Sequence, residues 1–155
     1  MKNGTLNINL NSLPGFHDIS RKVLPNGITL LARSNFQSAS VVLSGYIGAG
    51  SLFDPNEKLG LAHFTSLALM RGTKTRDFQQ IFEHLETIGA SLGFGASVHN
   101  TNLGGRCLVD DLPLVAEILS DCVINPVFPE SYVERLRTQL LTSLAIRAQD
   151  TAEMA

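Results

Sequence analysis

The histidines and their acidic neighbours are the residues of this chain best suited to metal-dependent chemistry. His63 has no acidic neighbour, His84 lies between Glu83 and Glu86, and His99 follows further along the chain. A hydrolytic zinc site takes about three protein ligands and one water molecule. Glu83 and His84 are adjacent, so on a helix they diverge by about 100° and cannot both reach one ion together with His63. A metal site assembled from these residues is therefore disfavoured, and we expect His84 on a solvated helix face and His99 at the tip of a hairpin.

Ser66, next to Thr65, raises the question of a nucleophilic serine. In many hydrolases such a serine lies in a Gly-x-Ser-x-Gly turn and has a histidine and an acid as partners. The residues around Ser66 do not form this turn, and no Asp/His pair is evident as its partner. Serine hydrolysis is therefore far less favoured than the alternatives.

The composition predicts a globular chain without a role in binding polyanions. Of the 155 residues, 44% are apolar and 17% are charged, which is typical of a single folded domain. The net charge of −2 gives no reason to expect nucleic acid or an anionic membrane surface as a partner. No stretch reaches the roughly 20 apolar residues of a membrane span, and no secretory signal is recognisable. By default we therefore expect a cytoplasmic protein that is not bound to a membrane.

The two cysteines, Cys107 and Cys122, do not have the spacing of a metal site. They fall in stretches predicted as a strand and a helix. We expect two buried thiols in a reducing compartment rather than a disulfide.

The elements that would position these side chains alternate between strands and helices. Residues 1–18 are polar and predict an N-terminal arm, and residues 19–155 predict one folded segment. Its order of strands, two helices, strands and two helices predicts an α+β fold, with a mixed, largely antiparallel sheet backed by helices. The predicted elements are a hairpin of 19–24 and 28–32 around Pro25-Asn26-Gly27, a strand 41–47, a helix 57–70, a helix capped by Thr75 and ended by Gly89, two strands within 90–109 around His99-Asn100, a helix opened by Asp111, and a helix from Pro129.

Several segments, in order, resemble the pitrilysin/insulinase metallopeptidases, the inverzincins with an H-x-x-E-H motif. The signature-like segment runs from Gly60 to Thr73 and reads GLAHFTSLALMRGT. The flanking segments that share the resemblance are Leu24–Ile28, Gly48–Ser51, Phe82–Leu92 and Asn125–Phe128. The resemblance covers about Val23 to Asp150 and implies a domain like that of the mitochondrial processing peptidase. It also implies that this chain is cut short before the last helices and final strand of that domain.

The resemblance further implies that the zinc motif is degenerate. In a working member, two histidines four residues apart bind zinc from one helix, and the Glu before the second His acts as base on the zinc-bound water. His63 matches the first His, whereas Ser66 replaces the Glu and Leu67 replaces the second His. The distant Glu ligand would fall near Ser143, where the chain has no carboxylate.

A lone imidazole binds zinc weakly, and a serine hydroxyl has no basicity near neutral pH. We therefore expect no catalytic residue, no metal and no cofactor in this chain, although active relatives bind zinc. His63 would then be a remnant of ancestry, which we prefer, or a partly buried imidazole bonded to the backbone.

The family also holds its substrate peptide as a strand added to the edge of the zinc-bearing domain. The matching strand here is Ser91–Ser97. Gly93 and Gly95 would leave the backbone unshielded and Phe94 would offer an apolar contact, which suits β-augmentation by an extended peptide. An equally favoured alternative is an ordinary strand whose glycines allow a close approach of a helix or a bulge.

The resemblance thus implies a non-catalytic subunit, because the family pairs active copies with inactive ones. Its partner would be an active zinc-bearing homologue or a second copy of the chain, and the pair would enclose and position a peptide substrate. One alternative is a structural or assembly scaffold without a peptide role. Another is an active zinc peptidase whose site lies outside this chain.

Overall fold

The computed structural model describes residues 15–149, and the chain divides into two compact units, Met1–Ser38 and Ala39–Ala155. Most of the predicted arm, residues 1–14, lies outside the described residues. The end of the arm forms one 3₁₀ turn, Phe16–Asp18, in which the Asp18 carboxylate accepts a hydrogen bond from Gly15 N at 3.1 Å. The boundary predicted at residue 18 stays a prediction.

The first unit contains a β-hairpin. Strand β1 (Ser20–Val23) pairs antiparallel with β2 (Thr29–Ala32). At the turn, Gly27 has a φ of 88°, a conformation that glycine adopts at little cost. The side chain of Asn26 accepts a hydrogen bond from Ile28 N at 3.2 Å. The predicted hairpin is therefore confirmed, although only the glycine of its Asn-Gly pair uses a positive φ.

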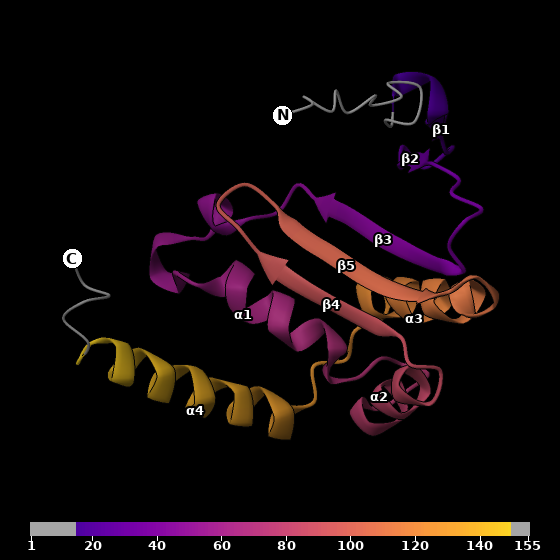
Figure 1. Ribbon diagram of the computed structural model, residues 1–155. Helices are drawn as coiled ribbons and strands as arrows, with labels where there is room; N and C mark the ends of the chain where they lie inside the picture. Colours follow the sequence, from indigo (N-terminus) through magenta and orange to yellow (C-terminus); the bar gives the residue numbers. More distant parts are fainter. Residues whose placement is uncertain (1–14, 150–155) are drawn as a thin grey trace, which may run out of the picture. The chain divides into compact units, whose positions relative to one another are not determined.

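The second unit is built on a three-stranded antiparallel sheet (Figure 1). Its strands are β3 (Ser40–Ile47), β4 (Ser91–Ala96) and β5 (Thr101–Leu108), in the spatial order β3-β5-β4. Burial alternates along β5, as expected when one face of a sheet is covered. Cys107, for example, is buried, whereas the preceding Arg106 is exposed. Because the strand order is β3-β5-β4, β5 is the central strand of the sheet and β4 is one of its edges.

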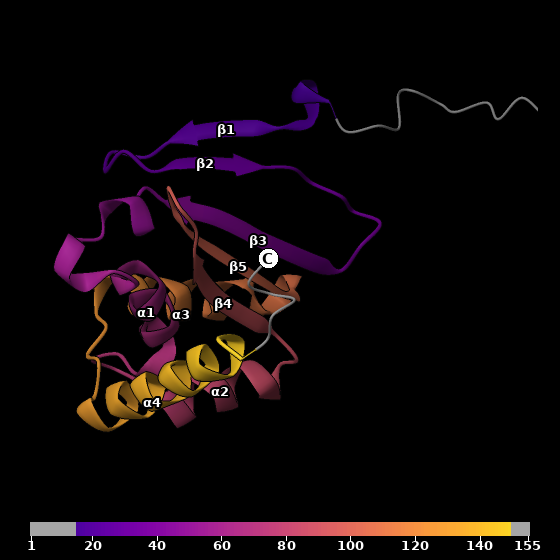
Figure 2. The same ribbon diagram turned by 90° about the vertical axis from the view of Figure 1, so that its left-hand side faces the viewer.

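Within the described residues, four α-helices lie on one side of this sheet (Figures 1 and 2). They are α1 (Leu61–Ala68), α2 (Phe78–Thr87), α3 (Leu112–Ile124) and α4 (Glu130–Arg147). The predicted α+β fold is confirmed, and α3 and α4 begin after Asp111 and Pro129 as predicted. None of these helices is long and apolar enough to cross a membrane. The core contains Met70, Ile81, Leu85, Cys107, Val115, Ile118 and Cys122.

Both cysteines are free thiols buried in this core, one in a strand and one in a helix as predicted. Burial, followed by the charge of Asp121, raises the pKa of the Cys122 thiol to about 11. Burial, followed by the charge of Asp111, also raises the pKa of the Cys107 thiol. Neither side chain is therefore a ready nucleophile near neutral pH.

The helix predicted from 57 to 70 is shorter than expected. Gly60 has a φ of 92°, and α1 begins only after it. The 3₁₀ turns Asn56–Lys58 and Leu69–Arg71 occupy the two ends of the predicted range. The left-handed conformation of Gly60 interrupts the helical path, which accounts for the difference.

The cap predicted at Thr75 is wrong, because Asp77 caps α2. Its Oδ1 accepts a hydrogen bond from Gln80 N at 2.8 Å, and the Gln80 side chain accepts one from Asp77 N at 2.9 Å. This reciprocal pair is a capping box, and its Asp-x-x-Gln spacing is visible in the sequence. The predicted end of the helix is confirmed, since Gly89 follows the last turn with a φ of 62°.

A buried carboxylate ties α3 to the loop before α2. Asp121 is 8% exposed, and its Oδ2 accepts a hydrogen bond from Thr75 Oγ1 at 2.5 Å. Asn125 Nδ2 donates to Oδ1 at 3.0 Å, and Arg76 NH1 lies 3.8 Å from Oδ2. Hydrogen bonding to the hydroxyls of Thr73 and then Thr75 holds the pKa of the Asp121 carboxyl below its ordinary value. These contacts fix the loop that connects α1 to α2.

Candidate functional site

The four predicted metal-site positions lie on two helices that pack together. His63, Ser66 and Leu67 are on α1, and Ser143 is on α4, which contacts α1. The side chain of His63 is exposed, Leu67 is half-buried, and Ser66 is only 2% exposed. The alternative in which His63 is partly buried is therefore wrong.

The hydroxyl of Ser66 is bonded within its own helix. Ser66 Oγ donates a hydrogen bond to the backbone oxygen of His63 at 2.8 Å. A buried serine in a helix is commonly satisfied by a carbonyl of the preceding turn. Ser66 therefore presents neither a nucleophile nor a base to solvent.

Asp54 anchors the N-terminus of α1. Its Oδ2 accepts a hydrogen bond from Gly60 N, and its Oδ1 accepts one from Ala62 N, both at 2.9 Å. A carboxylate at this end of a helix satisfies free N–H groups and interacts favourably with the helix dipole. Sequence reasoning misses Asp54 because it lies six residues before the nearer donor. Only the general preference for acidic residues near helix starts could have pointed to it.

The two other histidines considered as metal ligands, His84 and His99, lie on other elements. His84 is exposed on α2, with Nδ1 2.6 Å from the backbone oxygen of Gln80. His99 is exposed in the turn between β4 and β5, and both placements confirm the predictions. Within residues 15–149, no three His, Cys, Asp or Glu side chains gather as a metal site would require.

Strand β4 carries the three predicted peptide-binding residues, Gly93, Phe94 and Gly95. In the described part of the chain it pairs only with β5, so its other side is an open edge. Such an edge offers a row of unpaired backbone N–H and C=O groups to a further strand.

The closing bond of the hairpin shows which backbone groups face this edge. Ser97 N donates to Asn100 O at 2.7 Å. Hydrogen-bonded and non-hydrogen-bonded pairs alternate in an antiparallel ladder, so Gly93 and Gly95 direct their backbone groups towards β5. The backbone N–H and C=O groups of the alternate residues, Leu92, Phe94 and Ala96, therefore point towards the open edge.

Phe94 and the two glycines of β4 have different surroundings. Phe94 is half-buried and packs against the core. A Cβ added at Gly93 or Gly95 would meet no atom within 4 Å, and the register with β5 is regular from Ser91 to Ala96. Strand β4 is thus an ordinary regular strand, as the alternative had it, but its glycines neither admit a neighbouring helix nor form a bulge. Their role in peptide binding stays a prediction.

Residues 29–153 match the family described as Insulinase (Peptidase family M16). The chain belongs to this family. The resemblance inferred from the Gly60–Thr73 segment is thereby confirmed.

Relatives of this M16 chain include subunits of mitochondrial complexes. It is 32% identical over 118 residues to the mitochondrial-processing peptidase subunit beta of Neurospora crassa, covering 76% of this chain and 25% of that protein. It is 28% identical over 122 residues to the cytochrome b-c1 complex subunit 1 of Mus musculus, covering 79% and 25%. The chain thus spans about a quarter of the length of these relatives. The cytoplasmic location stays a prediction for this chain.

Two solved M16 structures share the fold. The crystal structure of pitrilysin matches with a TM-score of 0.73 and 25% identity, over 83% of this chain and 14% of that chain. A peptidase M16 inactive domain from Pseudomonas fluorescens matches with a TM-score of 0.81 and 24% identity, over 88% and 34%. The second likeness shows the fold alone.

Proposed function

We propose that this M16 chain is a non-catalytic homologue that pairs with an active, zinc-bearing family member to enclose and position a peptide substrate. The observation that carries the proposal is the state of the motif helix. At the position of the catalytic Glu, Ser66 is buried and bonded to the carbonyl of His63. At the position of the second His, Leu67 is half-buried and has no metal-binding atom.

The names of the similar proteins support both parts of this proposal. The Pseudomonas fluorescens structure is described as an inactive M16 domain and has the same fold. The Neurospora crassa relative is named as a subunit, so it belongs to an assembly. The open edge of β4, with backbone groups free for a further strand, supports peptide binding.

Zinc binding is the first test. Wild-type protein, purified without chelator, is expected to carry no zinc in native mass spectrometry and to show no heat of binding in a zinc titration. Leu67→His places a second imidazole four residues after His63, on the same helix face. This variant should bind zinc at least about tenfold more tightly than the wild type, a gain of about 1.4 kcal/mol.

Thr65→His is the matched control, because it adds a histidine two residues after His63, on a different face of α1. It should not reproduce the gain. One tightly bound zinc ion per wild-type chain would overturn the proposal of a non-catalytic site.

Pairing is tested with a zinc-bearing M16 homologue from the same organism. The two chains should co-purify, and the mixture should cleave peptides faster than the homologue does when it is alone. A homologue that neither binds this chain nor changes its rate would refute the pairing. Chelator-sensitive cleavage by this chain alone would refute its non-catalytic role.

A structural or assembly scaffold is a second candidate function. The similarity to subunit 1 of the mouse cytochrome b-c1 complex favours it. A scaffold would bind its partner chain but no extended peptide, so peptide binding separates the two functions. An H-x-x-E-H motif in a longer form of this polypeptide would instead favour an active peptidase.

A further inference from the structure

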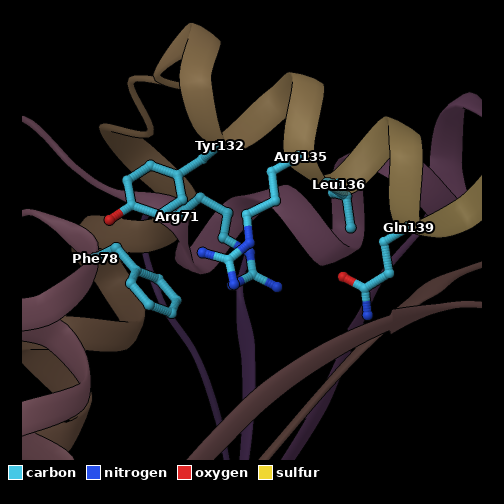
Figure 3. A pocket seen from close by; sticks show the side chains of 6 residues that line it. All are labelled: Arg71, Phe78, Tyr132, Arg135, Leu136 and Gln139. Carbon is cyan, nitrogen blue, oxygen red and sulfur yellow. The ribbon is translucent and has the colours of Figure 1, made fainter.

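A small pocket opens between the end of α1, the start of α2 and the side of α4 (Figure 3). Its volume is about 120 Å³. None of the motif positions and no residue of β4 lines the pocket, so an inference about it does not depend on the proposed function. It is lined by Arg71, Phe78, Tyr132, Arg135, Leu136 and Gln139.

Arg71 lines this pocket with a guanidinium group that is not fully hydrogen-bonded. Its guanidinium carbon lies 4.9 Å from the centre of the Phe78 ring, a cation–π contact that uses the flat face of the group. Its Nε atom is buried and has no hydrogen-bond partner in the described residues. Because Nε itself is buried, an oxyanion in the pocket would bind the terminal N–H groups of the Arg71 guanidinium.

Arg135 brings a second positive charge to the same pocket. Figure 3 shows the side chains of Arg71 and Arg135 projecting into it from the 3₁₀ turn Leu69–Arg71 and from α4. The ion pairs found within residues 15–149 involve Arg76 and Arg137 but neither of these two arginines. Two guanidinium groups at one pocket create a positive potential there, which favours the binding of an anion.

We infer that this pocket binds one oxyanion group, a carboxylate or a phosphate, between Arg71 and Arg135. The planar fork of a guanidinium matches two oxygens of such a group. Gln139, one helical turn after Arg135, adds an amide that can donate to the same oxygens. Phe78 and Leu136 provide an apolar wall beside it.

The size of the pocket limits what it holds. Its volume of about 120 Å³ is small for a ligand pocket. This accommodates the head group of an acid, whereas sites for drug-sized ligands measure about 300–1,000 Å³. The oxyanion therefore belongs either to a free small acid or to an acidic side chain of a bound polypeptide.

Nuclear magnetic resonance of the arginine Nε–Hε groups in the full chain tests this inference. Inorganic phosphate, sodium acetate and a short glutamate-containing peptide are each added at constant ionic strength, against sodium chloride as reference. The signal missing in Arg71→Gln identifies Arg71, and the signal missing in Arg135→Gln identifies Arg135. Saturable shifts of both signals with an oxyanion, absent with chloride, are the expected result.

The variants decide whether the site is specific. Arg135→Gln should weaken the response of the Arg71 signal by at least about tenfold in affinity, since one of the two charged donors is lost. Arg137→Gln is the matched control, because it removes an exposed arginine of the same helix that pairs with Glu134 at 3.3 Å. This control should leave the response unchanged.

Each outcome has a definite meaning. A response to phosphate and acetate supports a free small acid as ligand, and a response to the glutamate peptide alone supports a polypeptide side chain. No saturable shift with any of the three up to tens of millimolar would overturn the inference. An equal loss of affinity in Arg137→Gln and Arg135→Gln would also overturn it, because the attraction would then be general to the helix surface. Arg135 is exposed, so its variant remains informative even if Arg71→Gln does not fold.

Discussion

At the scale of single residues, the buried carboxylate of Asp121 holds the loop between α1 and α2. It accepts hydrogen bonds from Thr75 and Asn125 and lies near the guanidinium of Arg76. Hydrogen bonds to a charged acceptor in a poorly solvated place are stronger than those between neutral groups. The position of α2 therefore depends on the ionised form of this one side chain.

Replacing Asp121 with asparagine should lower the free energy of unfolding by about 1–3 kcal/mol at neutral pH. Folding lowers the pKa of this carboxyl, so its charged form stabilises the folded state. This contribution is complete above the pKa that the carboxyl has in the unfolded chain, about 3.9. It is lost as the pH falls through the lower pKa that the carboxyl has in the folded chain. Urea unfolding at a series of pH values should show the difference between wild type and Asp121→Asn shrinking below about pH 4.

Glu117→Gln is the matched control for this prediction. Its carboxylate oxygen lies 2.6 Å from the same guanidinium, that of Arg76, but its side chain is 63% exposed. Exposed ion pairs contribute only about 0–1 kcal/mol because water and salt screen them. If Glu117→Gln lowered the free energy of unfolding as much as Asp121→Asn does, burial of the carboxylate would not explain the effect.

At the scale of elements, the loop from β3 to α1 docks on the hairpin of β4 and β5. Ser51 N donates to Ser97 O at 3.0 Å, and Leu52 N donates to Val98 O at 2.9 Å. Gly50 lies beside these bonds and is buried. A Cβ added there would lie 2.5 Å from backbone atoms of Val98, His99 and Asn100.

Gly50→Ala should therefore destabilise the chain by about 1–3 kcal/mol, because backbone atoms cannot move aside as a flexible side chain can. The φ of Gly50 is −122°, which any residue adopts, so the cost arises from space alone. Denaturant midpoints measure the effect, with Gly48→Ala as control. A Cβ at Gly48 meets no atom within 4 Å, and its substitution should change stability by less than about 0.5 kcal/mol. Equal effects of the two variants would refute the close approach at Gly50.

Local signals account for the elements that the sequence predicts correctly. The Asn-Gly turn, the glycine after α2 and the proline before α4 each act within a few residues. The early start predicted for α1 fails at Gly60, which has a left-handed conformation and donates its N–H to Asp54, six residues earlier. The cap predicted at Thr75 fails because that hydroxyl binds Asp121, which is 46 residues away.

The candidate site follows the same division between local and distant signals. The placement of His63, Ser66 and Leu67 on one helix is predictable because it depends only on helical spacing. The burial of Ser66 and the packing of Phe94 against the core depend on which face each element turns inward. That choice is made by tertiary packing, so the sequence of the element alone does not determine it.

At the scale of the whole molecule, the open edge of β4 is the place where a further strand can join the sheet. Ladder alternation directs the N–H of Ala96 to this edge, and the N–H of Gly93 towards β5. A peptide bound at this edge would therefore accept a hydrogen bond from the N–H of Ala96. Gly93 offers this peptide no backbone hydrogen bond, and it has no side chain on the outer face of the sheet. The two residues thus distinguish strand addition from binding on the face of the sheet.

Ala96→Pro removes one donor from the edge and leaves the ladder with β5 intact. One hydrogen bond contributes about 0.5–1.5 kcal/mol net, so the affinity for an extended peptide should fall by about two- to tenfold. Fluorescence anisotropy of a labelled peptide measures this affinity, and urea unfolding checks that the variant is folded. Gly93→Ala should bind as the wild type does, since its added Cβ lies in open space. Unchanged binding by folded Ala96→Pro would exclude strand addition at β4, and a loss confined to Gly93→Ala would move the peptide to the outer face of the sheet.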